Sequence, residues 1–405
     1  MTLINSHYFK LNKLLLTFCG LWPYQTKLKR RINYTTFAII TLSMIFSLAG
    51  GIQSELNTGF MNISESIIAL LFFSTGFLKC TIFYNQRNQL KILYEQTAHD
   101  LKKMTHHLER DILQAFLLEA RNFNVVSLVY SIPIYIVFAI ATYLPQVFGF
   151  TNESAKYELH FFLYYKPMII HESVQDLQVL IHATISTIYV GSAYLCVSAT
   201  YISSVKHVCA LFEIARYRLK NVIVDHSNNN RRGLMKNASV ISNLIKVIDI
   251  HEKALRGVQR IDNVFNASLF ILEVTALSAV TILIFHLNYH QGNFRQMTRY
   301  STILSAFVSY LFFCNWFGEQ VIQSCNDIRE TAYNVNWYNM SLRARMFVLM
   351  IMQRTLKPVH LTAGTVVILS MENFSAFLKT AWSFGTLLLT TQKPSPKENS
   401  IFFEY

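Results

Sequence analysis

Charged residues are scarce in this sequence. Only 15% of its 405 residues are Asp, Glu, Lys or Arg, whereas soluble domains average about 25%. Hydrophobic residues make up 52% and aromatic residues 14%, a balance that predicts a membrane protein. The 36 basic residues outnumber the 23 acidic ones, but they cluster between hydrophobic runs, so this excess does not indicate nucleic-acid binding.

The sequence also lacks the motifs of common catalytic and metal sites. It contains no P-loop, no G-x-G-x-x-G, no H-E-x-x-H and no G-x-S-x-G. His286 and His290 have the spacing of a metal-binding pair, but no carboxylate or cysteine lies near them in the sequence, so an interfacial role is favoured. None of the six cysteines forms a C-x-x-C pair or lies in a loop predicted below to be extracellular, so we expect no disulfide framework. We predict no enzyme activity, cofactor or metal.

Seven mostly uncharged apolar runs are long enough to cross a bilayer as helices. They cover about Tyr34–Gln53, Ser64–Tyr84, Val125–Val147, Val179–Ser204, Asn266–Leu287, Tyr300–Phe317 and Leu361–Thr390. The predicted fold is therefore an all-α membrane protein with seven transmembrane helices. Lys79, near the end of the second span, is expected to snorkel toward the interface, and Glu273 in the fifth span is expected to be paired.

The orientation follows from the basic residues, which collect in cytosolic loops. Residues 1–33 contain six basic and no acidic side chains: Lys10, Lys13, Lys27, Lys29, Arg30 and Arg31. The linkers 85–124 and 205–265 are also strongly basic, whereas the loop after the third span has more acidic than basic residues. We therefore predict a cytosolic N-terminal segment over 1–33 and an extracellular tail over 391–405. Asn152, in an Asn-x-Ser motif of a predicted extracellular loop, is a glycosylation candidate.

The predicted cytosolic linkers are patterned as helices. Apolar residues recur at helical spacing in Leu90–Asn122 and Leu234–Val264, which predicts helices extending below the membrane. Residues 318–360 contain a third amphipathic segment leading into the final span. Such a cluster of amphipathic helices predicts subunit contacts.

The final span, Leu361–Thr390, combines apolar composition with a line of polar groups. The members of this polar stripe are spaced three or four residues apart, on one face of a helix: Glu372, Ser375, Lys379, Ser383, Thr386 and Thr390. Charged groups are costly in lipid, so the polar stripe should face protein or water. One interpretation is a buried packing seam. The other, which the stripe's length favours, is the wall of a water-filled conduit.

Seven spans suggest a G-protein-coupled receptor, but the cytosolic N-terminus and the lack of Asp-Arg-Tyr and Asn-Pro-x-x-Tyr motifs argue against that class. The sequence instead resembles the insect odorant receptors. The C-terminal signature comprises Trp316, Gly318-Glu319, Ser324, Ala332-Tyr333, Trp337, Arg345, Arg354, Pro358, Leu369-Ser370, Phe374, Phe377-Leu378-Lys379 and Thr386-Leu387-Leu388. Gly20-Leu21-Trp22-Pro23 and, more loosely, His207 through Leu219 also match.

The resemblance implies an odorant-gated, non-selective cation channel of the plasma membrane of olfactory sensory neurons. Such receptors are tetramers in which tuning subunits assemble with a shared co-receptor. The final span lines the pore, and the cytosolic helices, including 318–360, form the subunit anchor. The co-receptor carries an insertion in its second cytosolic loop that this chain lacks, which implies a tuning subunit. Lys379, Ser383, Thr386 and Thr390 would line the pore, with threonines where the co-receptor has a bulky apolar gate.

By the same resemblance, a small volatile ligand should bind in the outer halves of spans two, three, four and six, within an aromatic pocket. The candidates are Phe72, Thr75, Tyr135, Phe138, Thr142, Tyr143, Ile188, Tyr189, Ser192, Tyr300, Leu304 and Phe307. The alternative function is a multispan ligand-binding receptor or transporter without its own conductance. A transporter would usually contain internal repeats, and none is evident.

Overall fold

The computed structural model describes residues 8–55, 60–147, 172–222, 233–292, 294–357 and 359–392. The first helices are α1 (Lys10–Phe18), α2 (Lys27–Glu55), α3 (Phe60–Asn85), α4 (Arg87–Lys103) and α5 (His107–Val147). They are followed by α7 (Glu172–Asn221), α8 (Gly233–Tyr289), α9 (Phe294–Asn334), the 3₁₀ turn η2 (Trp337–Asn339) and α10 (Leu342–Thr355). Two short strands, β1 (Thr362–Ala363) and β2 (Val367–Ile368), precede the last helix, α11 (Met371–Gln392).

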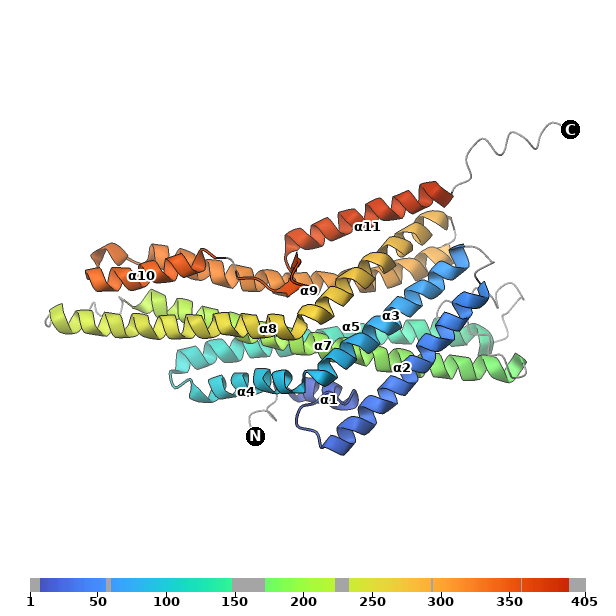
Figure 1. Cartoon of the computed structure of the whole chain (residues 1–405), viewed down its shortest axis with the longest axis horizontal. Helices are drawn as coiled ribbons and strands as arrows, with labels where there is room; N and C mark the ends of the chain where they lie inside the picture. The colour runs from blue at the N-terminus through green and yellow to red at the C-terminus, as the bar shows by residue number, and fades with distance from the viewer. Residues whose placement is uncertain are drawn as a thin grey trace.

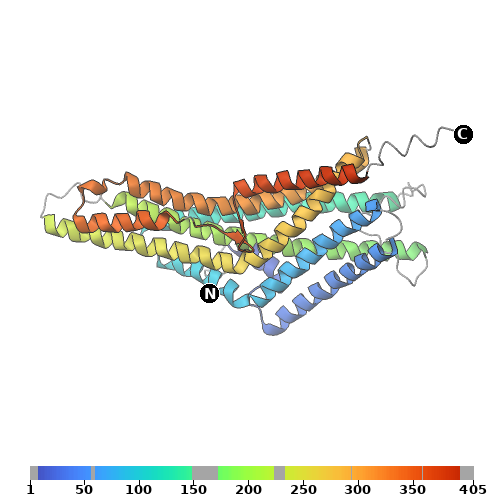
Figure 2. The same ribbon diagram turned by 45° about the horizontal axis from the view of Figure 1, so that its top comes forward.

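The long helices run lengthwise and divide the molecule into two halves (Figure 1). We call the half that contains α4 and α10 the packed half, and the half that contains α2, α3 and α11 the splayed half. Helices α7, α8 and α9 run through both halves without a loop, but α8 bends near the middle, and its second part diverges from the bundle alongside α3 (Figures 1 and 2). Helices α2 and α11 also diverge in both views.

Among the described residues, six helices are long and apolar enough to cross a membrane. These segments are Lys27–Gln53, Ile63–Asn85, His107–Ser131, Ile181–Asn221, Ala238–Tyr289 and Gln296–Asn334. Each overlaps one of the first six predicted spans, so the all-helical, multispan prediction is confirmed to that extent. Helix α11 is not among the six, because its polar stripe lowers its mean hydropathy.

Helix α7 forms the centre of the fold and contacts α1, α2, α3, α5, α8 and α9. Its sequence supplies small buried residues, among them Ala193, Ala199 and Ala210, which let neighbouring backbones approach closely. Near the middle of the molecule, the buried Asn12 of α1 donates hydrogen bonds to Ala199 O at 3.2 Å and Ser203 Oγ at 3.0 Å. The N-terminal segment is thus part of the core through α1.

Buried charged pairs connect the helices of the packed half. The Asp100 carboxylate on α4 is 1% exposed; it lies 3.1 Å from His207 Nε2 of α7 and also pairs with Lys253 of α8. Burial alone would raise the pKa of Asp100, but hydrogen bonds and charge attraction from His207 and Lys253 outweigh it and lower that pKa. Arg218 of α7 makes a two-point pair with Glu109 of α5, at 2.6 and 2.7 Å.

The structure divides two of the predicted helices and extends a third. The segment Leu90–Asn122 is interrupted after Lys103, where Met104 is extended, so α4 ends there and α5 begins at His107. The predicted helix over 318–360 is likewise two helices, α9 and α10, separated by the turn at Trp337–Asn339. Helix Leu234–Val264 is confirmed, but it is continuous with the fifth span as α8.

The seventh predicted span also begins too early. Its first residues form the β1–β2 hairpin, in which Thr362 pairs with Ile368 and Ala363 with Val367. Gly364 and Thr365 both have positive φ, at 65° and 63°, a turn conformation incompatible with a continuing helix. Helix α11 starts only at Met371, so the prediction of one helix over Leu361–Thr390 is wrong for this part.

Candidate functional site

The last helix has two opposite faces. On one face Ala381 and Gly385 are buried, and Phe374 and Phe377 pack against the hydrophobic core. The polar stripe lies on the other face: Glu372, Ser375, Lys379, Ser383 and Thr390 are exposed and Thr386 is partly exposed. In this chain the stripe is therefore not a seam between its own helices, and it remains open to a partner or to water.

Close contact with α8 holds α11 in place (Figures 1 and 2). An added Cβ at Gly385 would lie 2.7 Å from Ile284 Cγ2 and 3.2 Å from the Thr281 carbonyl oxygen. A side chain at this position would therefore separate the two helices. The lack of a side chain at Gly385 sets the distance between α11 and α8.

The start of α11 is fixed by residues of the C-terminal signature. Ser370 caps the helix, since its Oγ accepts a hydrogen bond from Asn373 N at 3.1 Å. On α9, Asn315 Oδ1 accepts from Ser370 N and Glu319 Oε2 accepts from Met371 N, each at 3.2 Å. These acceptors satisfy backbone N–H groups that a helix start leaves unpaired.

The hairpin before α11 is held between α8 and α9. Thr362 N donates to Asp262 Oδ1 of α8 at 2.6 Å, and Asn266 Nδ2 of α8 donates to Thr362 Oγ1 at 2.6 Å. On the α9 side, a Cβ on Gly318 would lie 2.5 Å from Leu369 O. The signature residues Gly318-Glu319 and Leu369-Ser370 thus meet at one junction.

Two predicted ligand residues on α3 lie against α7. Phe72 stacks on Tyr194, with ring centroids 5.2 Å apart and an interplanar angle of 5°. Thr75 is 1% exposed, and its Oγ1 has no hydrogen-bond partner among the described residues. This contact of α3 is close, because a Cβ on Gly76 would lie 2.5 Å from Val190 Cγ1.

The α7 candidates face other helices. Tyr189 stacks on Phe18 at 4.8 Å, and Ser192 Oγ lies 3.2 Å from Cys19 Sγ, so both contact the α1 region. Ile188 is 50% exposed. The structure therefore does not bring these three side chains together with Phe72 and Thr75.

The α9 candidates pack on α3 and α8. Tyr300 is buried, donates a hydrogen bond to Glu65 and stacks on His286 at 4.6 Å. Leu304 and Phe307 pack beside it and also belong to a hydrophobic cluster with Val280, Ile284, Phe377 and Ala381. These two candidates thus join the predicted ligand region to α11.

Other candidates cannot be placed as side chains. Tyr135, Phe138, Thr142 and Tyr143 belong to α5, but their side chains lie outside the described part of the structure. Asn152, the glycosylation candidate, also lies outside the described residues. Glu273, predicted to be either paired near the interface or functional, is buried, and it accepts a hydrogen bond from the Asn315 amide at 3.4 Å.

Lys79 is the residue that the sequence interpretation placed wrongly. It does not snorkel: it is 1% exposed, and its ammonium lies beside the rings of Tyr194 and Tyr310. The reason is that α3 presents this position to α7 and α9 rather than to its outer face. A signal was available, because Phe72, Thr75 and Lys79 share one helix face at spacings of three and four residues.

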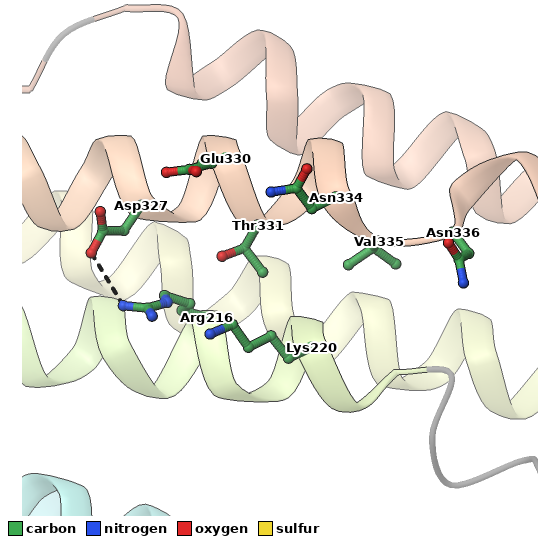
Figure 3. Close-up of a pocket in the computed structure, with 8 residues that line it drawn as sticks. All are labelled: Arg216, Lys220, Asp327, Glu330, Thr331, Asn334, Val335 and Asn336. Carbon is green, nitrogen blue, oxygen red and sulfur yellow. Dashed lines mark hydrogen bonds and ion pairs between the residues drawn. The ribbon is translucent and has the colours of Figure 1, made fainter.

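A polar groove of about 390 Å³ lies elsewhere, between α7 and α9 in the packed half (Figure 3). Its lining residues are Arg216, Lys220, Asp327, Glu330, Thr331, Asn334, Val335 and Asn336. Arg216 pairs with Asp327 across it at 3.1 Å. A small apolar ligand would gain little from such a charged surface.

Comparisons with known proteins agree with this architecture. The sequence model of the 7tm odorant receptor family matches residues 60–382, well over half of the chain. The structure is similar to the insect olfactory receptor OR5 of Machilis hrabei, with a TM-score of 0.74, 14% identity, and coverage of 95% of this chain and 98% of that one. The structure of OR5 in complex with eugenol also gives a TM-score of 0.74, over 96% of this chain and 100% of that one.

Sequence relatives match over shorter stretches. Odorant receptor 33b of Drosophila melanogaster is 26% identical over 147 residues, which are 36% of this chain and 39% of the relative. Odorant receptor 67c of the same species is 21% identical over 201 residues, 50% of this chain and 47% of the relative. The odorant receptor coreceptor of Anopheles gambiae is 22% identical over 182 residues, 43% of this chain and 38% of the relative. The matched regions thus span less than half the length of these relatives.

The family match runs from the start of α3 to about the middle of α11, and the structural match extends over nearly the whole chain. Members of this family are multi-pass membrane receptors and not enzymes, in keeping with the six long apolar helices. The chain belongs to the insect odorant receptor family.

Proposed function

We propose that this chain is the tuning subunit of an odorant-gated, non-selective cation channel in the plasma membrane of olfactory sensory neurons. The observation that carries the proposal is the geometry of α11. Its apolar face is packed on α8 and α9, and its polar stripe from Glu372 to Thr390 is left open. The Thr386 and Thr390 hydroxyls donate to carbonyls of their own helix, but no other described helix covers the stripe. A line of polar groups that includes Glu372 and Lys379 is costly in lipid and is accommodated along a water-filled path.

The proposed topology has seven spans, with the N-terminus in the cytosol and the C-terminus outside. The basic linkers 85–124 and 205–265 supply α4 and parts of α5, α7 and α8 in the packed half, which supports a cytosolic location for that half. Its exposed groove and amphipathic helices would then face neighbouring subunits.

One α11 can form only one wall of a conduit, so the proposal requires further subunits. We take the assembly to be a tetramer with the shared co-receptor, each subunit contributing its last helix. Lys379, Ser383, Thr386 and Thr390 would line this chain's share of the pore. A stripe that ends in threonines forms a weaker hydrophobic gate than bulky apolar residues.

A volatile ligand would bind among α3, α5, α7 and α9 in the splayed half and act by population shift. The packing supports a short route to the pore. Leu304 and Phe307 of α9 pack with Val280 and Ile284 of α8 in the cluster that also holds Phe377 and Ala381 of α11. A ligand that binds the open arrangement and displaces these α9 side chains would thereby change the position of α11 relative to α8 and α9.

The test is whole-cell current in cells that express this chain with an insect co-receptor, during application of a broad panel of volatiles. Thr386→Trp is compared with Thr391→Trp, a matched change five residues further and about 140° around the helix. We expect odorant-evoked cation current in the wild type, altered ion selectivity or amplitude in Thr386→Trp, and little change in Thr391→Trp. Surface labelling controls for expression.

If Thr386→Trp and Thr391→Trp change the current equally, the polar stripe does not line the conduit. Ligand binding at the cell surface without current under any pairing would favour the alternative, a ligand-binding receptor or transporter without its own conductance.

A further inference from the structure

We propose that Lys79 and Thr75 form the polar end of the ligand site and select volatiles that carry a carbonyl oxygen: ketones, aldehydes and esters. This inference rests on the proposed function, and it assigns that site a ligand class. It starts from two buried polar groups whose hydrogen-bonding capacity is not filled by the described residues.

Lys79 is buried, and no described residue is its counter-ion. Its Nζ donates to Tyr310 Oη at 3.1 Å and lies 4.8 Å from the centre of the Tyr194 ring and 4.7 Å from that of Tyr310. Among the described residues no carboxylate pairs with it, and α5 residues 132–147 include no Asp or Glu. Attraction to the two aromatic rings offsets part of the cost of burying the charge.

An ammonium group has three N–H donors, and the described structure supplies one hydrogen-bond acceptor, Tyr310 Oη. The rings of Tyr194 and Tyr310 meet edge to face, with centroids 5.5 Å apart, so they cover two sides of the charge. A buried donor that lacks an acceptor is costly, which makes an incoming acceptor oxygen favourable.

Thr75 lies one helical turn from Lys79, about 6 Å along the axis of α3. Its Oγ1 is buried and has no partner among the described residues, although threonine hydroxyls in helices commonly bond to the backbone four residues earlier. Phe72, on the next turn of the same face, stacks on Tyr194. One column of α3 thus presents an ammonium group, then a hydroxyl, then an aromatic ring.

This arrangement fits a ligand with one acceptor oxygen and an apolar body. The carbonyl would accept a hydrogen bond from Lys79 or Thr75, while the hydrocarbon part contacts the aromatic side chains. An alkane would leave both groups unpaired, and a protonated amine would be repelled by the ammonium charge.

The experiment uses the full chain with its co-receptor and a panel of 2-ketones, n-aldehydes, acetate esters, n-alkanes and primary amines of matched chain lengths. In the wild type we expect the carbonyl compounds to be the strongest activators. In Lys79→Met, which keeps the length and removes the charge, we expect the potency ratio of each carbonyl compound to its alkane to fall about tenfold or more. Thr75→Val, which keeps the shape, should lower the ratio less.

The matched control is Lys206→Met. Lys206 is also a buried lysine, 3% exposed, but it pairs with Glu119 at 2.6 Å. A buried ammonium group with a generic structural role would change expression in both variants and leave the potency ratio alone. A reduced ratio in Lys79→Met with an unchanged ratio in Lys206→Met supports the inference.

The wild-type ranking alone can also overturn the inference, whether or not Lys79→Met reaches the surface. If alkanes or amines activate as strongly as the carbonyl compounds, Lys79 does not select for oxygen, although the channel proposal stands. If the wild type gives no current to any volatile, the proposed function fails and this inference fails with it.

Discussion

The two halves of the molecule are stabilised by different kinds of contact. In the packed half, charged and amide side chains are buried in pairs, such as Asp100 with His207 and Lys253, and Arg218 with Glu109. In the splayed half one ion pair joins described residues, Glu65 with Arg299, and the helices also pack through apolar clusters such as that of Val280, Ile284 and Ala381. Large side chains such as Phe46 and Trp382 remain exposed there, at 72% and 59%. Directional bonds fix one arrangement, whereas apolar contacts tolerate small displacements of whole helices. The comparison places rigidity in the packed half and adjustability in the splayed half.

The largest effect should come from breaking the buried pairs of the packed half. Asp100→Asn leaves His207 and Lys253 without their carboxylate, and removal of one partner of a buried pair costs about 3–5 kcal/mol. We expect a lower Tm for the detergent-purified receptor and reduced surface expression. Asp327→Asn, at a 49% exposed side chain paired with Arg216, should cost less than about 1 kcal/mol. Equal losses in both variants would show that burial of the pair does not determine how much it stabilises the packed half.

The same aspartate makes the packed half sensitive to acid. Its pKa is lowered in the folded state, so its contribution to the free energy of unfolding is fully present above about pH 4, the usual aspartate range. That contribution is lost as the pH falls through the lowered folded-state pKa. Thermal unfolding measured at pH 7, 4 and 3 should show a smaller loss of Tm in Asp100→Asn than in the wild type. Parallel pH profiles would show that Asp100 is not responsible.

A smaller effect is expected where α11 lies on the splayed half. Gly385→Val places a side chain within 3.2 Å of Ile284 and the Thr281 carbonyl, an overpacking that costs about 1–3 kcal/mol. Odorant-evoked current should fall while surface expression is retained. The control is Gly50→Val in α2, because no described atom beyond the adjoining residues and backbone of its own helix lies within 4 Å of a Cβ built at Gly50. Normal current from Gly385→Val would mean that the α8–α11 contact does not position the pore helix.

The smallest effect tests the polar stripe itself. A positive charge about 8 Å from a permeating cation in water opposes it by about 0.5 kcal/mol, roughly a twofold effect. Lys379→Gln should therefore raise single-channel cation conductance about twofold. It should also raise the permeability of divalent relative to monovalent cations, measured as a shift of the reversal potential. Lys357→Gln, an exposed lysine outside α11, serves as the control. An unchanged conductance in Lys379→Gln would exclude this side chain from the pore wall.

The sequence predicted most helices because hydropathy and periodicity are local properties. The prediction that the six stripe residues share one face of a helix was correct for the same reason. The hairpin around Gly364 was missed because apolar residues such as Val366 and Val367 extend a hydrophobic run whatever their backbone conformation. The break at Met104 was missed for a similar reason, since the helical spacing of apolar residues continues on both sides of it.

The partners of buried polar groups were harder to predict. Lys79 was assigned to the interface because its neighbours on α7 and α9, Tyr194 and Tyr310, are more than 100 residues away along the chain. The pairing of Asp100 with Lys253 spans a similar separation. Such contacts depend on how helices are placed side by side, and helical spacing within one segment carries no information about that placement.

The uninterrupted course of α7, α8 and α9 limits how the receptor can move. These helices cross from one half to the other without a loop, so any motion there has to be a bend or a shift of continuous helices, and α8 is already bent at that level (Figures 1 and 2). Helix α11 is attached differently, through a two-stranded hairpin anchored by Asp262 of α8 and by Asn315 and Glu319 of α9. In the proposed opening motion the hairpin would act as the pivot of α11. A small tilt there would be magnified along the roughly 30 Å of α11 and would have to loosen the contact of Gly385 with Ile284, close to Thr386 and Thr390.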